Sequence, residues 1–181
     1  MAFGDASGEQ TQEERLRIAR RYRERRGAEL RALAEPFAAG EVVAAGEFST
    51  IPTEAIASIP GLGMLLLPLA RRRSRRTGLS PRVLLALTAD TVHALAVDAA
   101  GLRRDETEVR PARTWPRDEV SAERGGRAFM RDKVLLHVPD ADGPLTLYAP
   151  TLRTNPWSAE VVRLLGGEAP EPLDLSGGEA G

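Results

Sequence analysis

The 181-residue chain contains no cysteine, which excludes disulfide bonds, thiolate catalysis and cysteine-ligated zinc. Aromatic residues make up only 4% of the sequence, so leucine, valine and alanine must form most of any core. The first ten residues hold neither a basic segment nor an apolar run, and no signal peptide is predicted. These absences favour a cytoplasmic protein with one ordinary domain and extensions.

The chain also has few residues with reactive side chains. Its two histidines, His93 and His137, fall in separate predicted strands and lack the spacing of a metal site. Asp140 and Asp142 resemble half of a calcium loop, but Thr151 stands where the closing acidic ligand belongs, so a hairpin turn is predicted. No glycine-rich phosphate loop or nucleophile motif occurs. We therefore expect no catalysis, cofactor or metal.

Arginine accounts for all but one of the 25 basic residues, Lys133 being the exception, which is typical of a GC-rich bacterial genome. The formal charge is −1, so nucleic-acid binding is not favoured. The sequence suggests five segments, namely a disordered terminus (1–10), an N-terminal helix (11–38), an irregular apolar and basic insertion (39–79), a folded module (80–167) and a flexible tail (168–181).

The N-terminal helix is predicted to begin at a capping box formed by Thr11 and Glu14. Its eight arginines are interspersed with glutamates, and its apolar stripe is thin. We expect a mostly exposed helix that docks through Leu30, Leu33 and Phe37. The glutamates disfavour its use as a nucleic-acid-binding arm.

The insertion combines an apolar stretch (55–70) with an arginine cluster (71–76). Proline and glycine interrupt the apolar stretch, so a membrane-spanning helix is not expected. One interpretation is an insertion whose leucines pack on the module or on another copy. The alternative is contact with an anionic membrane surface, for which the candidate residues are Leu62, Leu65, Leu66, Leu67, Arg71, Arg72, Arg73, Arg75 and Arg76.

Short alternating segments after residue 80 predict antiparallel strands. They lie at 82–88, 92–98, 106–110, 133–138 and 145–148, with turns at 89–91, 99–101, 125–126 and 140–143. Asn155 and Pro156 then open a short helix that should bury Trp157, Val161, Leu164 and Leu165. Trp115 is expected to close one end of the module.

These segments resemble the bacterial pleckstrin-homology-like domains of an uncharacterised actinobacterial family. The resemblance rests on residues 81–95, 115–120, 145–148 and 155–165. It implies an α+β, mainly β fold, in which a C-terminal helix caps an antiparallel β-barrel. In the lipid-binding relatives, basic residues lie in the loop between the first two strands. That loop is expected here at Ala89–Thr91, which is short and acidic.

The predicted function is a non-enzymatic interaction module that binds a protein partner or associates with itself. The alternative is a peripheral membrane protein at the inner face of the plasma membrane, attached through residues 55–70 and 71–76.

Overall fold

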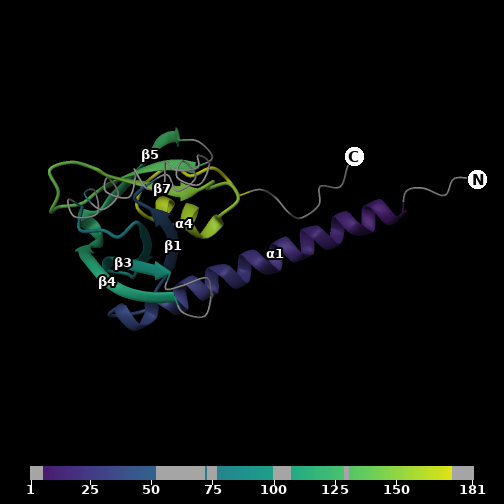
Figure 1. The fold of residues 1–181 in the computed structure, drawn as a ribbon, viewed down its shortest axis with the longest axis horizontal. Coiled ribbons are helices and arrows are strands. Elements are labelled where there is room, and N and C mark those ends of the chain that lie inside the picture. The colour runs from purple at the N-terminus through teal and green to yellow at the C-terminus, as the bar shows by residue number, and fades with distance from the viewer. Residues whose placement is uncertain (1–5, 52–71, 73–76, 100–106, 129–130, 173–181) are drawn as a thin grey trace, which may run out of the picture.

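A computed structural model describes residues 6–51, 72, 77–99, 107–128 and 131–172 (Figure 1). It contains one seven-stranded antiparallel sheet in the order β4-β3-β2-β1-β7-β6-β5. Helix α1 (Ala6–Ala34) precedes the sheet and helix α4 (Pro156–Leu164) follows it. The predicted α+β class is confirmed.

Two meanders make up the sheet, and they meet between β1 and β7. The strands are β1 (Ala44–Ser49), β2 (Arg82–Leu87), β3 (Thr91–Ala99), β4 (Thr107–Pro116), β5 (Ser121–Ala128), β6 (Arg131–His137) and β7 (Leu145–Pro150). One registered pair, Ser49 with Tyr148, joins β1 to β7. No strand pairing between described residues joins the edge strands β4 and β5, so the predicted closed barrel is wrong in this respect. Pro111 and Pro116 leave β4 without two backbone donors, as suits an edge strand.

The main hydrophobic core lies between the two meanders, and α4 packs into it (Figure 1). Alternate residues of the strands point inward, as β6 shows with buried Val134 and Leu136 between half-buried neighbours. Val161, Val162 and Leu165 add the inner face of α4 to this core. Leu164 is 37% exposed, which corrects its predicted burial.

β2 is buried on both faces, which explains its nearly continuous apolar sequence. Val83, Leu85 and Leu87 belong to the main core. Leu84 and Ala86 face a second cluster beneath α1, whose buried members are Leu30, Ala34, Val42, Ala45, Leu84, Ala86, Leu95 and Trp157. The predicted docking of α1 is confirmed, because Leu30 and Ala34 are buried there while Leu33 and Phe37 pack against the cluster.

Close contact with β1 fixes the position of α4. A Cβ atom on Gly46 would lie 2.8 Å from the Cα atom of Ser158, so glycine permits this approach. The Ser158 hydroxyl also donates to the Glu47 carbonyl at 3.1 Å. Gly166, at φ +82°, and Gly167 end α4 by donating to the carbonyls of Arg163 and Val162, a Schellman motif.

The structure places the start of the sheet earlier than predicted. The sequence allows a strand start at Val42 and Val43, with Phe48 nearby, but assigns these residues to the irregular insertion. In the structure β1 lies at the centre of the sheet and pairs with β2 from Ala44 to Ser49. A short apolar run of valine and alanine with Gly46 gives little strand periodicity, because β1 is covered on both faces. The folded module therefore begins near Ala44 rather than near residue 80.

Three further boundaries differ from the predictions. α1 begins at Ala6 instead of capping at Thr11, so residues 6–10 are helical rather than disordered. Gly125 and Gly126 lie within β5 at a register shift rather than in a turn between strands. Asn155 precedes α4 as predicted, but its side chain donates to the Thr151 carbonyl instead of capping the helix.

Candidate interaction surfaces

Most residues of the predicted membrane contact lie outside the described part of the chain. They are Leu62, Leu65, Leu66, Leu67, Arg71, Arg73, Arg75 and Arg76. Arg72 is described and is exposed. No helix in the described ranges is both long enough and apolar enough to cross a membrane.

The structure does define where this segment leaves and rejoins the sheet. Ser49 pairs with Arg82 at the end of the β1–β2 ladder. Just beyond, the Thr50 amide donates to the Pro81 carbonyl at 3.0 Å, and the Thr50 hydroxyl donates to the Ser80 carbonyl at 3.3 Å. The segment is therefore the connection between the first two strands, a position that the sequence had assigned to Ala89–Thr91.

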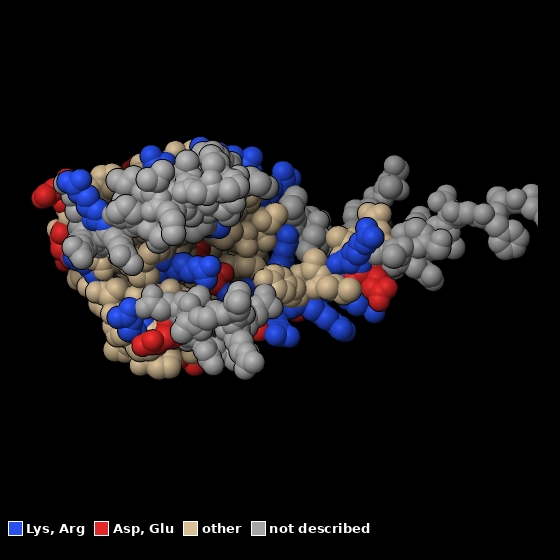
Figure 2. Space-filling model, in the orientation of Figure 1, with Lys and Arg blue, Asp and Glu red and all other residues tan. Residues whose placement is uncertain are grey.

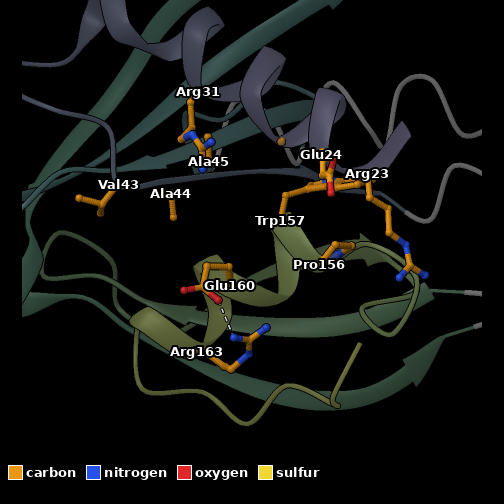
Figure 3. Close-up of a pocket in the computed structure, with 11 residues that line it drawn as sticks. Arg23, Glu24, Arg31, Val43, Ala44, Ala45, Pro156, Trp157, Glu160 and Arg163 are labelled. Carbon is orange, nitrogen blue, oxygen red and sulfur yellow. Dashed lines mark hydrogen bonds and ion pairs between the residues drawn. The ribbon is translucent and has the colours of Figure 1, made fainter. Parts of the chain in front are cut away.

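A second surface is a cleft between α1, α4 and the start of β1, with a volume of about 300 Å³ (Figure 3). We call it the α1–α4 cleft. Val43 is 43% exposed and directly precedes β1, whose first two residues, Ala44 and Ala45, also line the cleft. The full lining is Arg23, Glu24, Gly27, Arg31, Val43, Ala44, Ala45, Pro156, Trp157, Glu160 and Arg163. The cleft thus combines an apolar floor with charged walls.

Trp157 crosses from α4 toward α1 in this cleft (Figure 3). Its ring meets Tyr22 edge to face, with 6.3 Å between the ring centroids. The side chain is only 8% exposed, and its Nε1–H has no hydrogen-bond acceptor among the residues that the structure describes. An unpaired buried donor is unfavourable and is uncommon in folded proteins, so this group can gain from an added acceptor.

Ion pairs lie in the cleft and beside it. Glu160 and Arg163 pair at 2.5 Å on α4 (Figure 3). Arg26 joins α1 to Glu47 of β1 and also contacts Glu29. Burial lowers the pKa of Arg26, but the attraction of Glu47 and the bonds to both carboxylates more than offset it, so the pKa is raised. Hydrogen bonds from Arg25 and Arg26 lower the pKa of Glu29.

The N-terminal part of α1 extends away from the rest of the molecule as an arm (Figure 1). Between residues 15 and 26 the helix carries seven arginines and one glutamate, a net charge of +6. Blue arginine side chains line the arm above and below in Figure 2. Charge summed over the whole helix, with its glutamates, conceals this local excess.

His93 and His137 are not brought together. His93 is 6% exposed, and its ring nitrogens lie 2.8 Å from the Thr91 hydroxyl and 3.1 Å from the Thr114 hydroxyl. Burial lowers its pKa, which favours the neutral ring. His137 is half-buried on β6, with its Nε2 atom 3.5 Å from a carboxylate oxygen of Glu123.

Two carboxylates tie strands together instead of forming a site. Asp132 is 1% exposed and accepts from Arg124 Nη2 and from the Leu152 amide, both at 2.8 Å. Asp140 accepts from Trp115 Nε1 at 2.7 Å and from Arg113, so its loop is tied to the edge strand β4. Burial raises the pKa of Asp140, but the bonds from Trp115 and Arg113 more than offset it and lower the pKa. Sequence reasoning identified Trp115 but missed Asp132, whose place in an alternating strand gave no signal.

In the ranges that the structure describes, no group of three or more histidine, aspartate or glutamate side chains is arranged to hold a metal ion. The cleft and the arm are candidate binding surfaces. Comparison of the chain with protein-family models, with curated proteins and with solved structures gives no match.

Proposed function

We propose that this chain is a non-catalytic interaction module of the pleckstrin-homology-like class that binds a protein partner in the α1–α4 cleft. The strand order and the single helix after β7 support the resemblance in fold. The side chains of His93, Asp132 and Asp140 hydrogen-bond to neighbouring strands and loops and so hold the sheet together. The exposed α1–α4 cleft then supports binding as the function.

The observation that carries the proposal is the unpaired indole N–H of Trp157 in a cleft with an apolar floor. Protein interfaces favour buried aromatic anchors surrounded by arginine, and both are present here. A peptide that enters the cleft covers Val43 and offers carbonyl or carboxylate acceptors close to the indole. The cleft volume of about 300 Å³ suits one or two side chains rather than a large ligand.

A random peptide library displayed on phage tests the proposal directly. The intact chain should enrich peptides whose binding is lost in Val43→Asp, because a charge on the cleft floor opposes apolar contact. Leu164→Asp is the matched control, since Leu164 is 37% exposed against 43% for Val43 and lies outside the cleft. Enriched peptides that bind Val43→Asp as well as the unaltered chain would contradict the proposal.

Membrane attachment is a second candidate, and one structural observation favours it. The apolar and arginine-rich segment connects β1 to β2, since the Thr50 hydroxyl at its start donates to the Ser80 carbonyl at its end. In lipid-binding relatives of the suggested family, the loop between the first two strands carries the basic residues. The sequence argument against lipid binding concerned Ala89–Thr91, which instead connects β2 to β3. Each arginine near an anionic surface contributes about 1 kcal/mol.

Flotation on vesicles that contain phosphatidylserine separates the two candidates. If the membrane candidate is right, the chain floats at low salt, and glutamine at positions 71, 72, 73, 75 and 76 abolishes flotation. Val43→Asp should leave flotation unchanged. Absence of the unaltered chain from the vesicle fraction at low salt rejects this candidate.

A further inference from the structure

We infer that the partner of the α1–α4 cleft is an acidic peptide segment with an apolar anchor, which lies along α1 from the cleft onto the arginine arm. This inference rests on the proposed binding function and adds the chemistry of the partner. Three features of the described residues carry it: the charge of α1, the apolar floor of the cleft, and the unpaired donor of Trp157.

The exposed face of the arm carries a row of like charges. Arg17, Arg21 and Arg25 follow one another at helical spacing i, i+4, so neighbouring guanidinium groups lie side by side. Arg25 pairs with Glu29 at 2.7 Å. Like charges at this spacing repel one another and destabilise the helix. A carboxylate partner relieves that repulsion.

The arm and the cleft form one continuous surface. Arg23, Gly27 and Arg31 line the cleft from α1. Arg20 precedes Arg23 at helical spacing i, i+3, so the two side chains are neighbours along the helix, and Arg17 precedes Arg20 at the same spacing. Sixteen residues from Ala6 to Arg21 extend the helix by about 24 Å beyond the Tyr22–Trp157 contact. A peptide anchored at Val43 can therefore continue along α1 and meet further arginines.

The observations favour an acidic peptide over other anionic partners. A nucleic-acid backbone matches the arginines but offers no apolar side chain for the floor at Val43 and Ala45. A membrane-bound helix needs an apolar face, whereas the arginines of α1 lie on several sides of the helix. Pairing of two arms at residues 15–26 places equal positive charges together, which disfavours a second copy of this chain.

Fluorescence anisotropy with three synthetic peptides and one nucleic acid tests the inference. The first probe is a short labelled peptide of glutamate and aspartate that contains one leucine and one phenylalanine. The second replaces its acidic residues by lysine, and the third replaces the leucine and phenylalanine by alanine. The fourth probe is duplex DNA of arbitrary sequence. All are titrated with the full chain at low salt, where charge pairing is least screened.

We expect the first probe to bind at least about tenfold more tightly than the other three. Arg17→Glu with Arg21→Glu should weaken that binding by about tenfold, because each reversal replaces an attraction by a repulsion. The matched control is Arg82→Glu with Arg153→Glu, which changes the net charge equally at exposed positions outside the surface and should change binding by less than about twofold. Trp157→Phe, which removes the indole donor, should also weaken binding.

Several results overturn the inference. Tighter binding of the lysine peptide than of the acidic peptide would mean that the partner is basic rather than acidic. Equal binding of duplex DNA or of the alanine peptide means that the surface attracts any anion. Equal losses in the two double variants mean that overall charge, rather than this surface, controls binding. If no probe binds, the acidic partner is rejected. The phage library distinguishes the two failures, since cleft-dependent peptides that are not acidic leave the proposed function intact.

Discussion

Replacement of Gly46 by alanine tests how the sheet positions α4. The added methyl group would lie 2.8 Å from the Cα atom of Ser158, 3.1 Å from Phe48 and 3.2 Å from Val161. The shortest of these contacts is to backbone, so a change of side-chain rotamer does not relieve it, and α4 must move away from β1. Overpacking of a well-packed core costs about 1–3 kcal/mol.

Urea unfolding followed by circular dichroism measures the loss in free energy of unfolding, and thermal unfolding measures the accompanying change in Tm. For a chain of this size, a loss of about 2 kcal/mol corresponds to a decrease in Tm of about 4–8 °C. The same chemical change at Gly27 provides the control, because nothing lies within 4 Å of a Cβ there. Gly27→Ala should stabilise α1 by about 0.5–1 kcal/mol, since alanine favours a helix interior. If Gly46→Ala is as stable as the unaltered chain, the proposed close packing is wrong.

Three further predictions concern the buried polar contacts. Asp132→Ala should lower the free energy of unfolding by about 2–4 kcal/mol in urea titrations, because it leaves the Leu152 amide and Arg124 without their acceptor; a loss below about 0.5 kcal/mol would argue against this contact. Burial lowers the pKa of His93, so the unfolded chain takes up the proton first, and stability should fall as the pH decreases through about 6.5. In His93→Gln the free energy of unfolding should fall less between about pH 7 and pH 5. If it falls as much as in the unaltered chain, groups other than His93 cause the decrease. Trp115→Phe should cost about 1 kcal/mol at neutral pH by removing the bond to Asp140. Because the pKa of Asp140 is lowered in the fold, its stabilising contribution is present above its usual value and should fade below about pH 4, where the Trp115→Phe difference should shrink in acid titrations.

The sequence predicted those elements whose local signals agree with their burial. β2, β3, β6 and β7 alternate or form apolar runs between clear turns, and α4 has both its proline start and its glycine stop. The sequence indicated a possible strand start at Val42 and Val43 but not its place in the sheet, because Ala44, Ala45 and Gly46 carry little strand preference and their burial depends on α1 and α4. Gly125 and Gly126 looked like a turn, although a bulge uses the same residues.

The candidate site was harder to predict than the fold, because it joins three elements from distant parts of the chain. Trp157 is buried as predicted, but it belongs to the cluster beneath α1 and also lines the cleft. No periodicity places Val43, Arg31 and Arg163 around one opening. The arginine excess of residues 15–26 was present in the sequence but was obscured by summing charge over the whole helix.

The hydrogen bonds of Thr50 to the carbonyls of Ser80 and Pro81 hold the ends of β1 and β2 together. The residues between them connect two adjacent antiparallel strands. The number of residues in this connection can therefore change without altering the strand order of the sheet. Loop closure entropy grows slowly, by about 0.6 kcal/mol for each doubling of length. A variant in which a tight turn replaces the segment should therefore keep the same sheet. Other sequences inserted between Thr50 and Ser80 should give variants that share this sheet and differ only in the connection.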